Sequence, residues 1–548
     1  MDFEAGSVRE SKSLILFVAG VLLVAAAAAA IRLPRLAQRP MHGDEAIHAQ
    51  KFATLLQDGQ YIYDPFEYHG PTLNYFTLIP AWLRGQHTYQ AIDEWTVRLV
   101  PVAFGVGLVL LVLGVADGLG RAAALAVAVL TAISHAMVFY SRYYIQEMLL
   151  VFFTFALIVC GWRYVRSRRG AWAIAGAVML AFMHATKETF VIAVAAIAAA
   201  AVLTLFLSRR RAEKENKSGP LISKRRLLVH LSLAALILVM VSAVLFSCAF
   251  RNPRGIVDSV LTFKTYLGRG AGHSTVHSHP WYYYLHILGW YRLDGGPLWT
   301  EALILLLGVI GLVAAFAKKG AGKADYGFLR FTAFYAIFMT VAYSLIPYKT
   351  PWCLLGFLHA WILLAAVGTV VLLRLARPTW VRVLVALLLL QGGGYLLWQA
   401  YLGTYRYYDD HANPYVYAHT GSDVFTIAAR VDEMAALHPD GKKMFIEVIC
   451  PGADYWPLPW YLRAYENVGY YSEVDMTAMP APVIIGYASL EKEILTKLFT
   501  VPPPGQRHTP VPLFDDYVEL RPTIELRGYV PHDLVEGRLK AHAEEGGP

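Results

Sequence analysis

Residues 13–31 read SLILFVAGVLLVAAAAAAI, an apolar run that contains no charged side chain. A helix needs about 20 apolar residues to cross the hydrocarbon core of a membrane, and this run is close to that length. It is long for the apolar part of a signal peptide, and the segment RLPRLAQRP that follows it is a poor cleavage site. We therefore expect a retained first membrane span.

The composition of the chain is typical of a membrane protein. Of its 548 residues, 57% are hydrophobic and only 16% are charged, whereas about 25% of the residues in soluble domains are charged. The net charge of +8 is modest, and the basic clusters lie between apolar runs rather than in a nucleic-acid-binding motif. We expect no nucleic acid partner. The four cysteines are scattered and predict neither a metal site nor a disulfide framework.

Similar apolar runs recur along most of the chain. They lie at 13–31, 99–116, 122–139, 148–162, 171–185, 189–207, 227–250, 301–317, 328–346, 353–373 and 380–401. At roughly 20 residues per span, they predict about eleven transmembrane helices. The fold class that we expect is a polytopic α-helical membrane protein with a C-terminal soluble α/β domain.

The loops rich in Lys and Arg predict the orientation of these spans. They are RYVRSRRG at 163–170, the long basic run at 208–226, KKGAGK at 318–323 and RLARP at 374–378. With eleven spans, all four loops fall on the side of the N-terminus, and an excess of Lys and Arg marks the cytoplasmic side. We therefore expect a multi-pass protein of the cytoplasmic (inner) membrane, with a cytoplasmic N-terminus and an extracytoplasmic C-terminal region.

The sequence predicts two domains. A transmembrane domain covers 1–401 and includes an extracytoplasmic first loop at 32–98, and an extracytoplasmic α/β domain covers 402–548. In the second domain, residues 422–437 have the pattern of an amphipathic helix with Ser422 as its N-cap. KMFIEVIC at 443–450 and APVIIGY at 481–487 have the composition of strands, and VPPPGQRHTPVP at 501–512 of a loop.

The first outer loop is expected to contain structure of its own. DEAIHAQKFATLLQDGQ at 44–60 has the apolar spacing of a helix. TLNYFTLIPAWL at 72–83 is apolar and aromatic but too short to cross a membrane, so we expect a helix that lies along the membrane surface.

Polar and ionisable residues gather at the predicted outer ends of the spans. At membrane depth such residues are rare and are usually functional or paired. They are Asp44 and Glu45, then His69, then Arg142 and Glu147 in YSRYYIQE, then His184, Lys187 and Glu188 in HATKET, and Tyr348 and Lys349 in PYKTPW. Because all these segments are predicted on one side, we expect them to line a cavity at the outer face.

This mixture of groups suits the transfer of a sugar from a lipid-linked donor. Lys349, Lys187 and Arg142 can neutralise the donor phosphate as it leaves. A carboxylate can take the proton from an acceptor hydroxyl. An inverting transfer needs one base and an in-line leaving group, and Asp44 can be that base.

The order of four segments resembles the GT-C glycosyltransferases, which include the protein O-mannosyltransferases and the aminoarabinose transferases of lipid A. The resemblance covers most of 13–400 and part of the C-terminal domain, and it is closest to a prokaryotic subfamily associated with flippase activity in archaeal glycosylation. The four segments are MHGDEAIHAQKFATLLQDGQYIYDPFEYHGPTLNY at 41–75, YSRYYIQEMLL at 140–150, YSLIPYKTPWCLLGFLHAW at 343–361 and YWPLPWYLR at 455–463.

The resemblance implies an enzyme that uses polyprenyl-phosphate sugars. Asp44 matches the proposed base of the family, and Glu45 matches a neighbouring acid that positions the acceptor or the base. Lys349 matches a lysine that contacts the donor phosphate, and Lys187 is a looser match. Glu147 lies where some relatives hold a second acid, but metal-dependent relatives have more acids in this turn. We therefore expect no metal cofactor, although a divalent metal is an alternative.

Each of these residues also has a structural explanation. Asp44 can be the N-cap of the helix that begins near Glu45, and the two lysines can anchor the chain at the interface. Arg142 can form an ion pair with Glu147, and His69 can cap or pack beside the proline that follows. His277 and His279 in the loop at 273–291 are too few for a zinc site.

The leading interpretation is a polyprenyl-phosphate-sugar-dependent glycosyltransferase (EC 2.4 type). It moves a sugar to an extracytoplasmic acceptor, a glycan, lipid or protein, with inversion and with Asp44 as general base; His69, Glu147 and Tyr348 complete the substrate site. The alternative is a non-catalytic protein that binds lipid-linked glycans or assists a flippase. A secondary transporter fits less well, because transporters place broken helices and polar groups near the membrane midplane.

Overall fold

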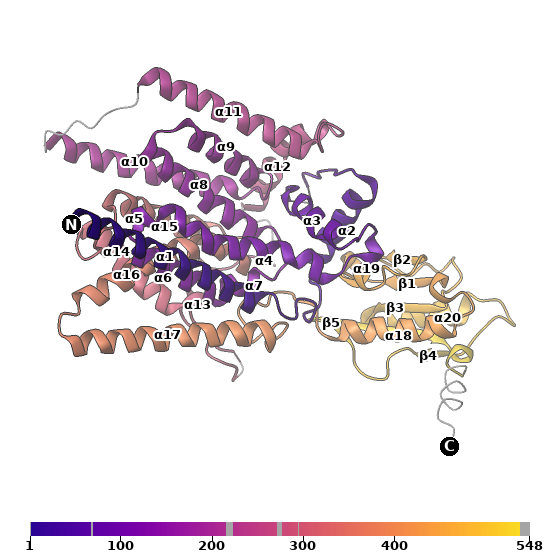
Figure 1. Ribbon diagram of the computed structural model, residues 1–548. Coiled ribbons are helices and arrows are strands. Elements are labelled where there is room, and N and C mark those ends of the chain that lie inside the picture. Colours follow the sequence, from indigo (N-terminus) through magenta and orange to yellow (C-terminus); the bar gives the residue numbers. More distant parts are fainter. Residues whose placement is uncertain (1, 67–68, 215–222, 271–276, 294, 537–548) are drawn as a thin grey trace. The chain divides into compact units, whose positions relative to one another are not determined.

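The computed structural model describes residues 2–66, 69–214, 223–270, 277–293 and 295–536 (Figure 1). The chain divides into two compact units. The helical unit contains Met1–Leu36, Asp58–Arg84 and Trp95–Tyr417, and the α/β unit contains Ala37–Gln57, Gly85–Glu94 and Ala418–Pro548. The α/β unit therefore begins later than the expected boundary at 402, and it includes two segments of the predicted first outer loop.

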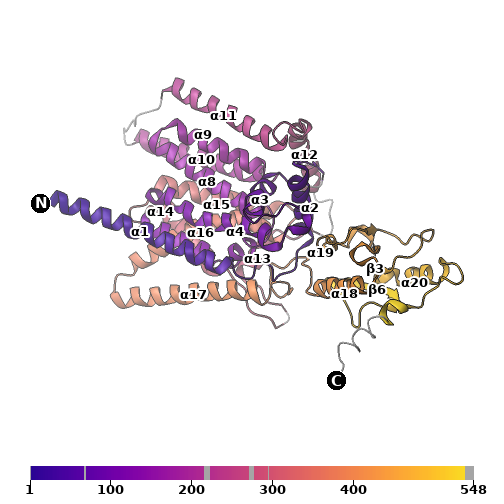
Figure 2. The same cartoon turned by 45° about the vertical axis from the view of Figure 1, so that its right-hand side comes forward.

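Long helices that run side by side make up most of the helical unit (Figures 1 and 2). The helices are α1 (Asp2–Arg32), α3 (Thr72–Leu83), α4 (Glu94–Leu110), η2 (Leu111–Val115), α5 (Ala116–Leu119), α6 (Arg121–Ile133), α7 (His135–Tyr140), α8 (Glu147–Ser167), α9 (Gly170–His184), α10 (Phe190–Lys214), α11 (Lys224–Phe246), α12 (Arg254–Gly270), α13 (Tyr283–Gly289), α14 (Ala302–Ala317), α15 (Tyr326–Leu345), η3 (Pro351–Leu354), α16 (Leu355–Leu375) and α17 (Thr379–Tyr405).

Among the described residues, eight helices are long and apolar enough to cross a membrane, and three more apolar helices are shorter, namely Arg121–Ile133, Gly170–His184 and Ala302–Ala317. Together they coincide with the eleven predicted spans, but three lie below the length of an ordinary span, so the count of eleven stays a prediction.

The predicted span at 122–139 is not a single helix. The run at 122–139 is broken at Ser134, whose backbone leaves the helical region with ψ at 127°. The Ser134 hydroxyl then accepts the N–H of Met137 and caps the short helix α7. A serine side chain offers the backbone a partner outside the helix, and the apolar composition of the run gives no sign of this break.

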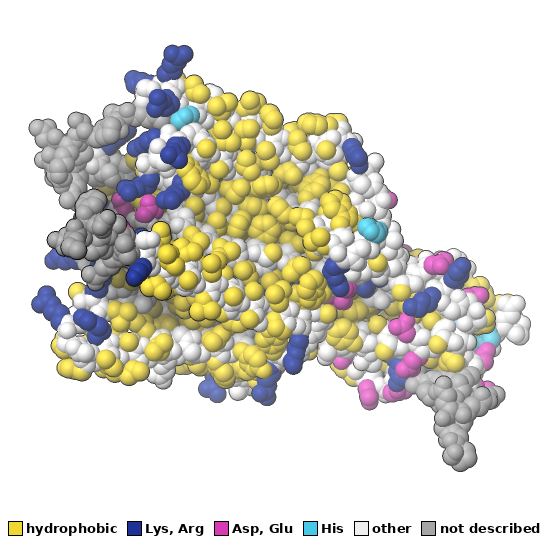
Figure 3. All heavy atoms as spheres, viewed as in Figure 1, with side chains coloured by type: hydrophobic (Ala, Val, Ile, Leu, Met, Phe, Trp, Pro, Cys, Tyr) yellow, Lys and Arg dark blue, Asp and Glu magenta, His cyan; other side chains and the backbone are white. Residues whose placement is uncertain are grey.

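Two of the basic loops, at 163–170 and 318–323, lie near the same segment of the helical unit, around residues 117 and 118. Asp117 forms ion pairs with Arg163 and Arg166, at 3.2 and 3.7 Å, and the N–H of Asp325 donates to the carbonyl of Gly118 at 2.8 Å. Figure 3 shows a broad hydrophobic band on this unit and many Lys and Arg side chains at the end where α1 begins. The asymmetry expected from the sequence is therefore present, as in proteins whose basic loops face the cytoplasm.

A mixed sheet forms the centre of the α/β unit. Its strands are β1 (Ile446–Ile449), β2 (Val468–Tyr471), β3 (Val483–Tyr487), β4 (Pro510–Pro512), β5 (Glu519–Arg521) and β6 (Ile524–Pro531). The order is β2-β1-β3-β6-β4, with β5 paired to β6. β1 is parallel to β2 and β3, whereas β6 is antiparallel to β3 and β4. The remaining elements are α2 (Gly43–Asp58), η1 (Tyr89–Ala91), α18 (Asp423–Leu437), η4 (Gly441–Lys443), η5 (Pro451–Ala453), α19 (Leu458–Tyr461), η6 (Ala488–Leu490) and α20 (Glu491–Thr500).

The sheet has a buried core on both faces, because successive side chains of a strand point in opposite directions. Ile446 and Val448 pack in one cluster with Val431 of α18. Ile449 packs in the other cluster with Ile494 of α20. Helix and strands therefore alternate as predicted for an α/β domain.

Local predictions in this unit are largely confirmed. The helix predicted at 44–60 is α2, and β1 and β3 fall within the two predicted strands. Ser422 does stand at the N-cap of α18, but its side chain makes no capping hydrogen bond. The predicted loop at 501–512 ends in the edge strand β4, where prolines are tolerated because one side needs no N–H donor.

Candidate functional site

The first turn of α2 carries the acid pair predicted from the sequence. His42 is the residue before the helix, and its Nδ1 accepts the N–H of Asp44 at 3.0 Å. In return the Oε2 atom of Glu45 accepts the N–H of His42 at 3.1 Å. This reciprocal arrangement is a capping box, in which two otherwise unpaired backbone donors are satisfied. The cap is therefore His42, and the alternative explanation of Asp44 as the N-cap is wrong.

Asp44 and Glu45 have very different surroundings. Glu45 is fully buried, and its second oxygen accepts from the Arg39 guanidinium at 3.1 Å. The side chain of Asp44 is 46% exposed, and its Oδ2 lies 3.9 Å from Nδ1 of His42. Asp44 can therefore meet a substrate, whereas Glu45 is held in place by its neighbours. A catalytic role for either residue stays a prediction.

In the helical unit, Lys187 and Glu147 form a buried ion pair. They line a cavity of about 20 Å³ together with residues of α15, η3 and α16, among them Tyr343 and Trp352. A cavity of this size has room for one water molecule. This cavity is therefore too small for a phosphate group, and the role of Lys187 at a donor phosphate stays a prediction.

A second buried acid lies beside this pair. The carboxylate of Glu188 accepts the hydroxyl of Tyr63 at 2.7 Å, and its other oxygen lies 2.7 Å from Nδ1 of His69. Burial alone would raise the pKa of Glu188, but His69 and the hydrogen bonds outweigh it and hold that pKa below its ordinary value of 4.5. Two backbone hydrogen bonds, from Gly70 to Thr186 and from Thr72 to Ala185, join the two segments.

Arg142 makes its contacts with the end of α1. Its guanidinium donates to the carbonyls of Arg32, Pro34 and Arg35, and it lies 5.1 Å from the ring centre of Tyr405. These carbonyls follow the last turn of a helix, where a cation is favourable. The contacts explain the burial of Arg142 in structural terms, and its role at a donor phosphate stays a prediction.

Lys349 and Tyr348 join two loops of the helical unit. The backbone of Tyr348 pairs with that of Ser278, and the Lys349 ammonium donates to the carbonyls of Ile346 and His279. Burial lowers the pKa of Lys349 below its ordinary value of 10.5. Backbone carbonyls thus hold this cation in place, and its role at a donor phosphate stays a prediction.

The predicted site residues therefore fall into two groups. Asp44 and Glu45 belong to the α/β unit, and the others belong to the helical unit, namely Arg142, Glu147, Lys187, Lys349, His69 and Tyr348. In the helical unit, contacts bring the turn at 140–147 to the turn at 184–189, and the latter to His69. Trp352 and Tyr143, whose ring centres lie 6.0 Å apart, join the turn at 347–352 to the same region.

No group of three or more His, Cys, Asp or Glu side chains that could hold a metal ion occurs within the described ranges. His277 lies 2.6 Å from the hydroxyl of Tyr417 through Nδ1, and His279 stacks on Tyr283 at 4.2 Å. Both histidines of the HxH pair are therefore part of an aromatic cluster with tyrosines.

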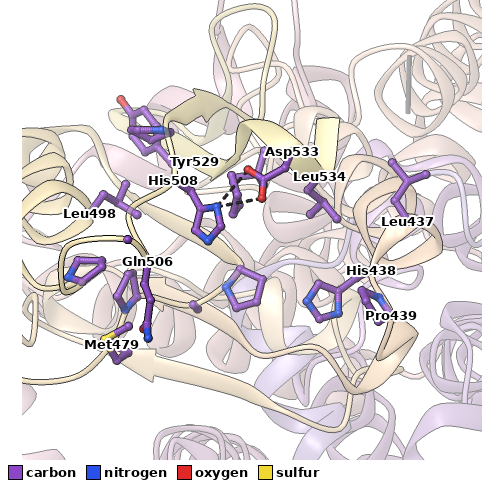
Figure 4. A pocket seen from close by; sticks show the side chains of 18 residues that line it. Leu437, His438, Pro439, Met479, Leu498, Gln506, His508, Tyr529, Asp533 and Leu534 are labelled. Atoms are coloured by element: carbon purple, nitrogen blue, oxygen red, sulfur yellow. Dashed lines mark hydrogen bonds and ion pairs between the residues drawn. The ribbon is translucent and has the colours of Figure 1, made fainter. Parts of the chain in front are cut away.

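A cavity of about 660 Å³ opens in the α/β unit, away from the predicted site residues (Figure 4). Its wall includes His508, whose Nδ1 lies 2.9 Å from a carboxylate oxygen of Asp533, together with Tyr529 and several prolines. None of the residues predicted for the site lines it. This cavity is therefore not the predicted substrate site.

Two residues that shape the site, His42 and Glu188, have no role predicted from the sequence. His42 caps α2, and a side chain just before an acidic first turn is a position where a cap is expected. Glu188 stands at the predicted outer end of a span, but its partners Tyr63 and His69 lie more than a hundred residues earlier in the chain. No local signal predicts such a pairing.

Comparison with known families supports the resemblance. Residues 76–252 match the family described as dolichyl-phosphate-mannose-protein mannosyltransferase. No match is found among curated proteins.

Two solved structures have a similar fold. ArnT from Cupriavidus metallidurans, bound to undecaprenyl phosphate, is 15% identical with a TM-score of 0.59, over 94% of this chain and 98% of that chain. The archaeal oligosaccharyltransferase AglB from Archaeoglobus fulgidus, in complex with an inhibitory peptide and a dolichol-phosphate, is 13% identical with a TM-score of 0.53, over 87% of this chain and 70% of that chain. At these identities the likeness shows the fold alone, and the expected GT-C-like fold is confirmed.

Proposed function

We propose that the protein is a membrane glycosyltransferase that moves a sugar from a polyprenyl-phosphate donor to an extracytoplasmic acceptor, with inversion. The similar ArnT structure contains undecaprenyl phosphate, and the similar AglB structure contains a dolichol-phosphate and a peptide. A lipid phosphate as donor carrier, and a glycan, lipid or protein as acceptor, are therefore the substrates proposed for this chain.

The observation that carries the proposal is the environment of Asp44. Its carboxylate is 46% exposed at the start of a helix, while its neighbours His42 and Glu45 are buried and hydrogen-bonded to each other. A base that acts on a substrate must be accessible and firmly placed. Of the two adjacent acids, only Asp44 meets both conditions.

In the proposed step, the acceptor oxygen attacks the anomeric carbon of the sugar while Asp44 takes the proton from that oxygen. The bond between the anomeric carbon and the phosphate oxygen breaks, and the polyprenyl phosphate leaves with the electron pair. Attack opposite the leaving group inverts the configuration. A cation beside the phosphate stabilises the charge that develops there.

Lys349, Lys187 and Arg142 are the proposed cations for this charge. Lys187 is paired with Glu147 and Arg142 with backbone carbonyls, so each must share its hydrogen bonds with an arriving phosphate. The Lys349 ammonium donates to the carbonyl oxygens of Ile346 and His279, which carry no formal charge and therefore compete less with a phosphate than a carboxylate does. We rank it first, and Lys349→Met is expected to raise the KM for the donor.

We also propose that the transfer needs no divalent metal. In the turn at 140–147 the single acid is Glu147, and the ammonium of Lys187 already neutralises it. Equal transfer rates with and without EDTA are the expected result.

The direct test is Asp44→Asn in the full-length protein. The gene is deleted in the native cells, which then express either the wild type or Asp44→Asn. Membranes from these cells are incubated with polyprenyl-phosphate [³H]mannose, and the label transferred from the donor to other molecules is measured. A general base contributes about 100-fold or more to a rate, so a loss of about that size is expected. Asp58→Asn is the matched control, because Asp58 is an exposed acid at the other end of α2.

Transfer by Asp44→Asn at the wild-type rate would show that the mechanism is wrong. If the wild-type protein binds the labelled donor but transfers nothing, from mannose or from a panel of other polyprenyl-phosphate hexoses, the non-catalytic alternative replaces the enzyme. A binder of lipid-linked glycans should also bind the donor equally well after Asp44→Asn.

A further inference from the structure

The backbone of Met41, three residues before Asp44, is held from two sides. The hydroxyl of Tyr461 accepts its N–H at 2.8 Å. The hydroxyl of Thr420 donates to its carbonyl oxygen, also at 2.8 Å. Buried backbone groups need such partners. Two side chains from the C-terminal part of the α/β unit therefore fix the peptide that leads into α2.

The neighbouring side chains extend this contact toward Asp44. Nε2 of His419 lies 3.4 Å from Nη1 of Arg39, whose other nitrogen binds Glu45. The ring of His419 also meets the ring of His42 edge-on, with centres 5.1 Å apart. Since His42 binds the N–H of Asp44, the first turn of α2 is connected to residues 419–420 by an unbroken series of contacts.

The anchors themselves are part of a packed core. Tyr461 ends α19, and its neighbours Leu458 and Leu462 are buried in the cluster that covers one face of the sheet. Thr420 is 2% exposed and lies just before α18, which covers the same face. Hydrogen bonds from side chains that are packed against a core restrict the backbone more than bonds from side chains on an exposed loop.

We propose that Tyr461 and Thr420 are positioning residues for Asp44, and that the C-terminal part of the α/β unit thereby holds the catalytic base in place through the backbone of Met41. This inference rests on the proposed function, because it takes Asp44 as the base. It assigns to the C-terminal domain a role in the transfer step itself, apart from binding an acceptor.

Tyr461→Phe and Thr420→Val each remove one hydroxyl with little change of shape. The loss of a hydrogen bond to a buried backbone group is expected to lower kcat by about tenfold, with the KM for the donor changed less than about twofold because the donor site is untouched. Thr420→Ser keeps the hydroxyl and should restore the rate. Hydrogen–deuterium exchange of the backbone N–H groups within 39–45 (Pro40 has none) should be faster in Tyr461→Phe and in Thr420→Val than in the wild type. In Thr420→Ser it should be as slow as in the wild type.

A double-mutant cycle separates positioning from a general structural effect. In the Asp44→Asn background, Tyr461→Phe should cause no further loss of the residual rate, since no base is left to position. A purely structural defect would lower that residual rate by its full factor. Tyr487→Phe is the control, because its hydroxyl donates to the Thr523 carbonyl at 3.1 Å elsewhere in the same unit. Its rate should equal that of the wild type.

The outcomes distinguish the two proposals. Wild-type activity in Asp44→Asn overturns the proposed function. An inactive Asp44→Asn beside wild-type rates in Tyr461→Phe and Thr420→Val overturns only the positioning role. Additive losses in the cycle, or unchanged exchange at 39–45, overturn the positioning role as well.

Discussion

Among single residues, Glu45 shows how the surroundings of a side chain decide its role. It is fully buried, and its two oxygens accept from Arg39 and from the backbone of His42. The sequence predicts the acid pair and its place after a membrane span. The sequence does not show which of the two acids is buried. The segment that carries Arg39 to Glu45 lies before α2 and has no periodic pattern from which this contact could be predicted.

Glu45→Ala should therefore destabilise the protein severely. It leaves the Arg39 guanidinium buried, at 8% exposure, without this carboxylate, and removing one partner of a buried ion pair costs about 3–5 kcal/mol. Glu45→Gln, which keeps an acceptor for the His42 N–H, should cost less. Thermal unfolding of the purified full-length protein measures both, and an unchanged unfolding temperature in Glu45→Ala would contradict the structural role.

The contact of Glu188 with His69 predicts a specific response to acid. The pKa of Glu188 lies below its ordinary value of 4.5 in the folded protein. A carboxylate of this kind stabilises the fold fully above its unfolded pKa, and this stability is lost as the pH falls through the lower folded pKa. Between about pH 6 and about pH 3, the unfolding temperature of the wild type should therefore fall more steeply than that of Glu188→Gln. Parallel curves for the two proteins would rule out this linkage.

At the scale of helices and strands, the apolar, β-branched composition of their segments predicted β1 and β3 but not their neighbours. β2 is VGYY, which is half exposed at the sheet edge, and β6 contains Arg527 and Gly528 within its run. Such strands are stabilised by their pairing with β1 and β3 rather than by a pattern of their own. In the predicted span at 122–139 the local pattern misleads instead. The residues stay apolar on both sides of Ser134, but the helix ends there.

A buried ion pair between β1 and α20 is a further feature that no local pattern reveals. Nζ of Lys497 lies 2.7 Å from Oε1 of Glu447, and the two side chains are 1% and 4% exposed. Lys497→Met leaves the carboxylate buried alone and should destabilise the protein by about 3–5 kcal/mol. Glu447→Leu combined with Lys497→Met should recover most of this loss, because the pair is replaced by apolar groups. Thermal unfolding of the single and double variants tests this, and an equally unstable double variant would contradict it.

For the whole molecule, the sequence predicted a membrane-spanning part and a C-terminal α/β part, and both are present. It did not predict that segments 37–57 and 85–94 pack with the α/β unit. The sequence predicts one continuous loop at 32–98 because two spans bound it. In the structure, 37–57 and 85–94 pack in the α/β unit, whereas 58–84 packs in the helical unit. Such a division depends on contacts between residues far apart in the chain, for example those of Met41 with Thr420 and Tyr461.

The orientation in the membrane depends on whether the three shorter apolar helices cross it. Eleven crossings place the two chain ends on opposite sides, and eight place them on the same side. Each short helix rises about 1.5 Å per residue and spans less than a bilayer of about 30 Å, which thinning of the lipid can accommodate.

We expect eleven crossings, because this count places all four basic loops of the sequence on one side of the membrane. In intact cells a membrane-impermeant maleimide should then label Ala478→Cys, which is exposed in the α/β unit. Ser167→Cys, which is exposed at the end of α8 within the basic segment 163–170, should react only after permeabilisation. Three of the four native cysteines are buried, so the wild type should give little background. Labelling of both variants in intact cells, or of Ser167→Cys alone, would reject the eleven-span topology.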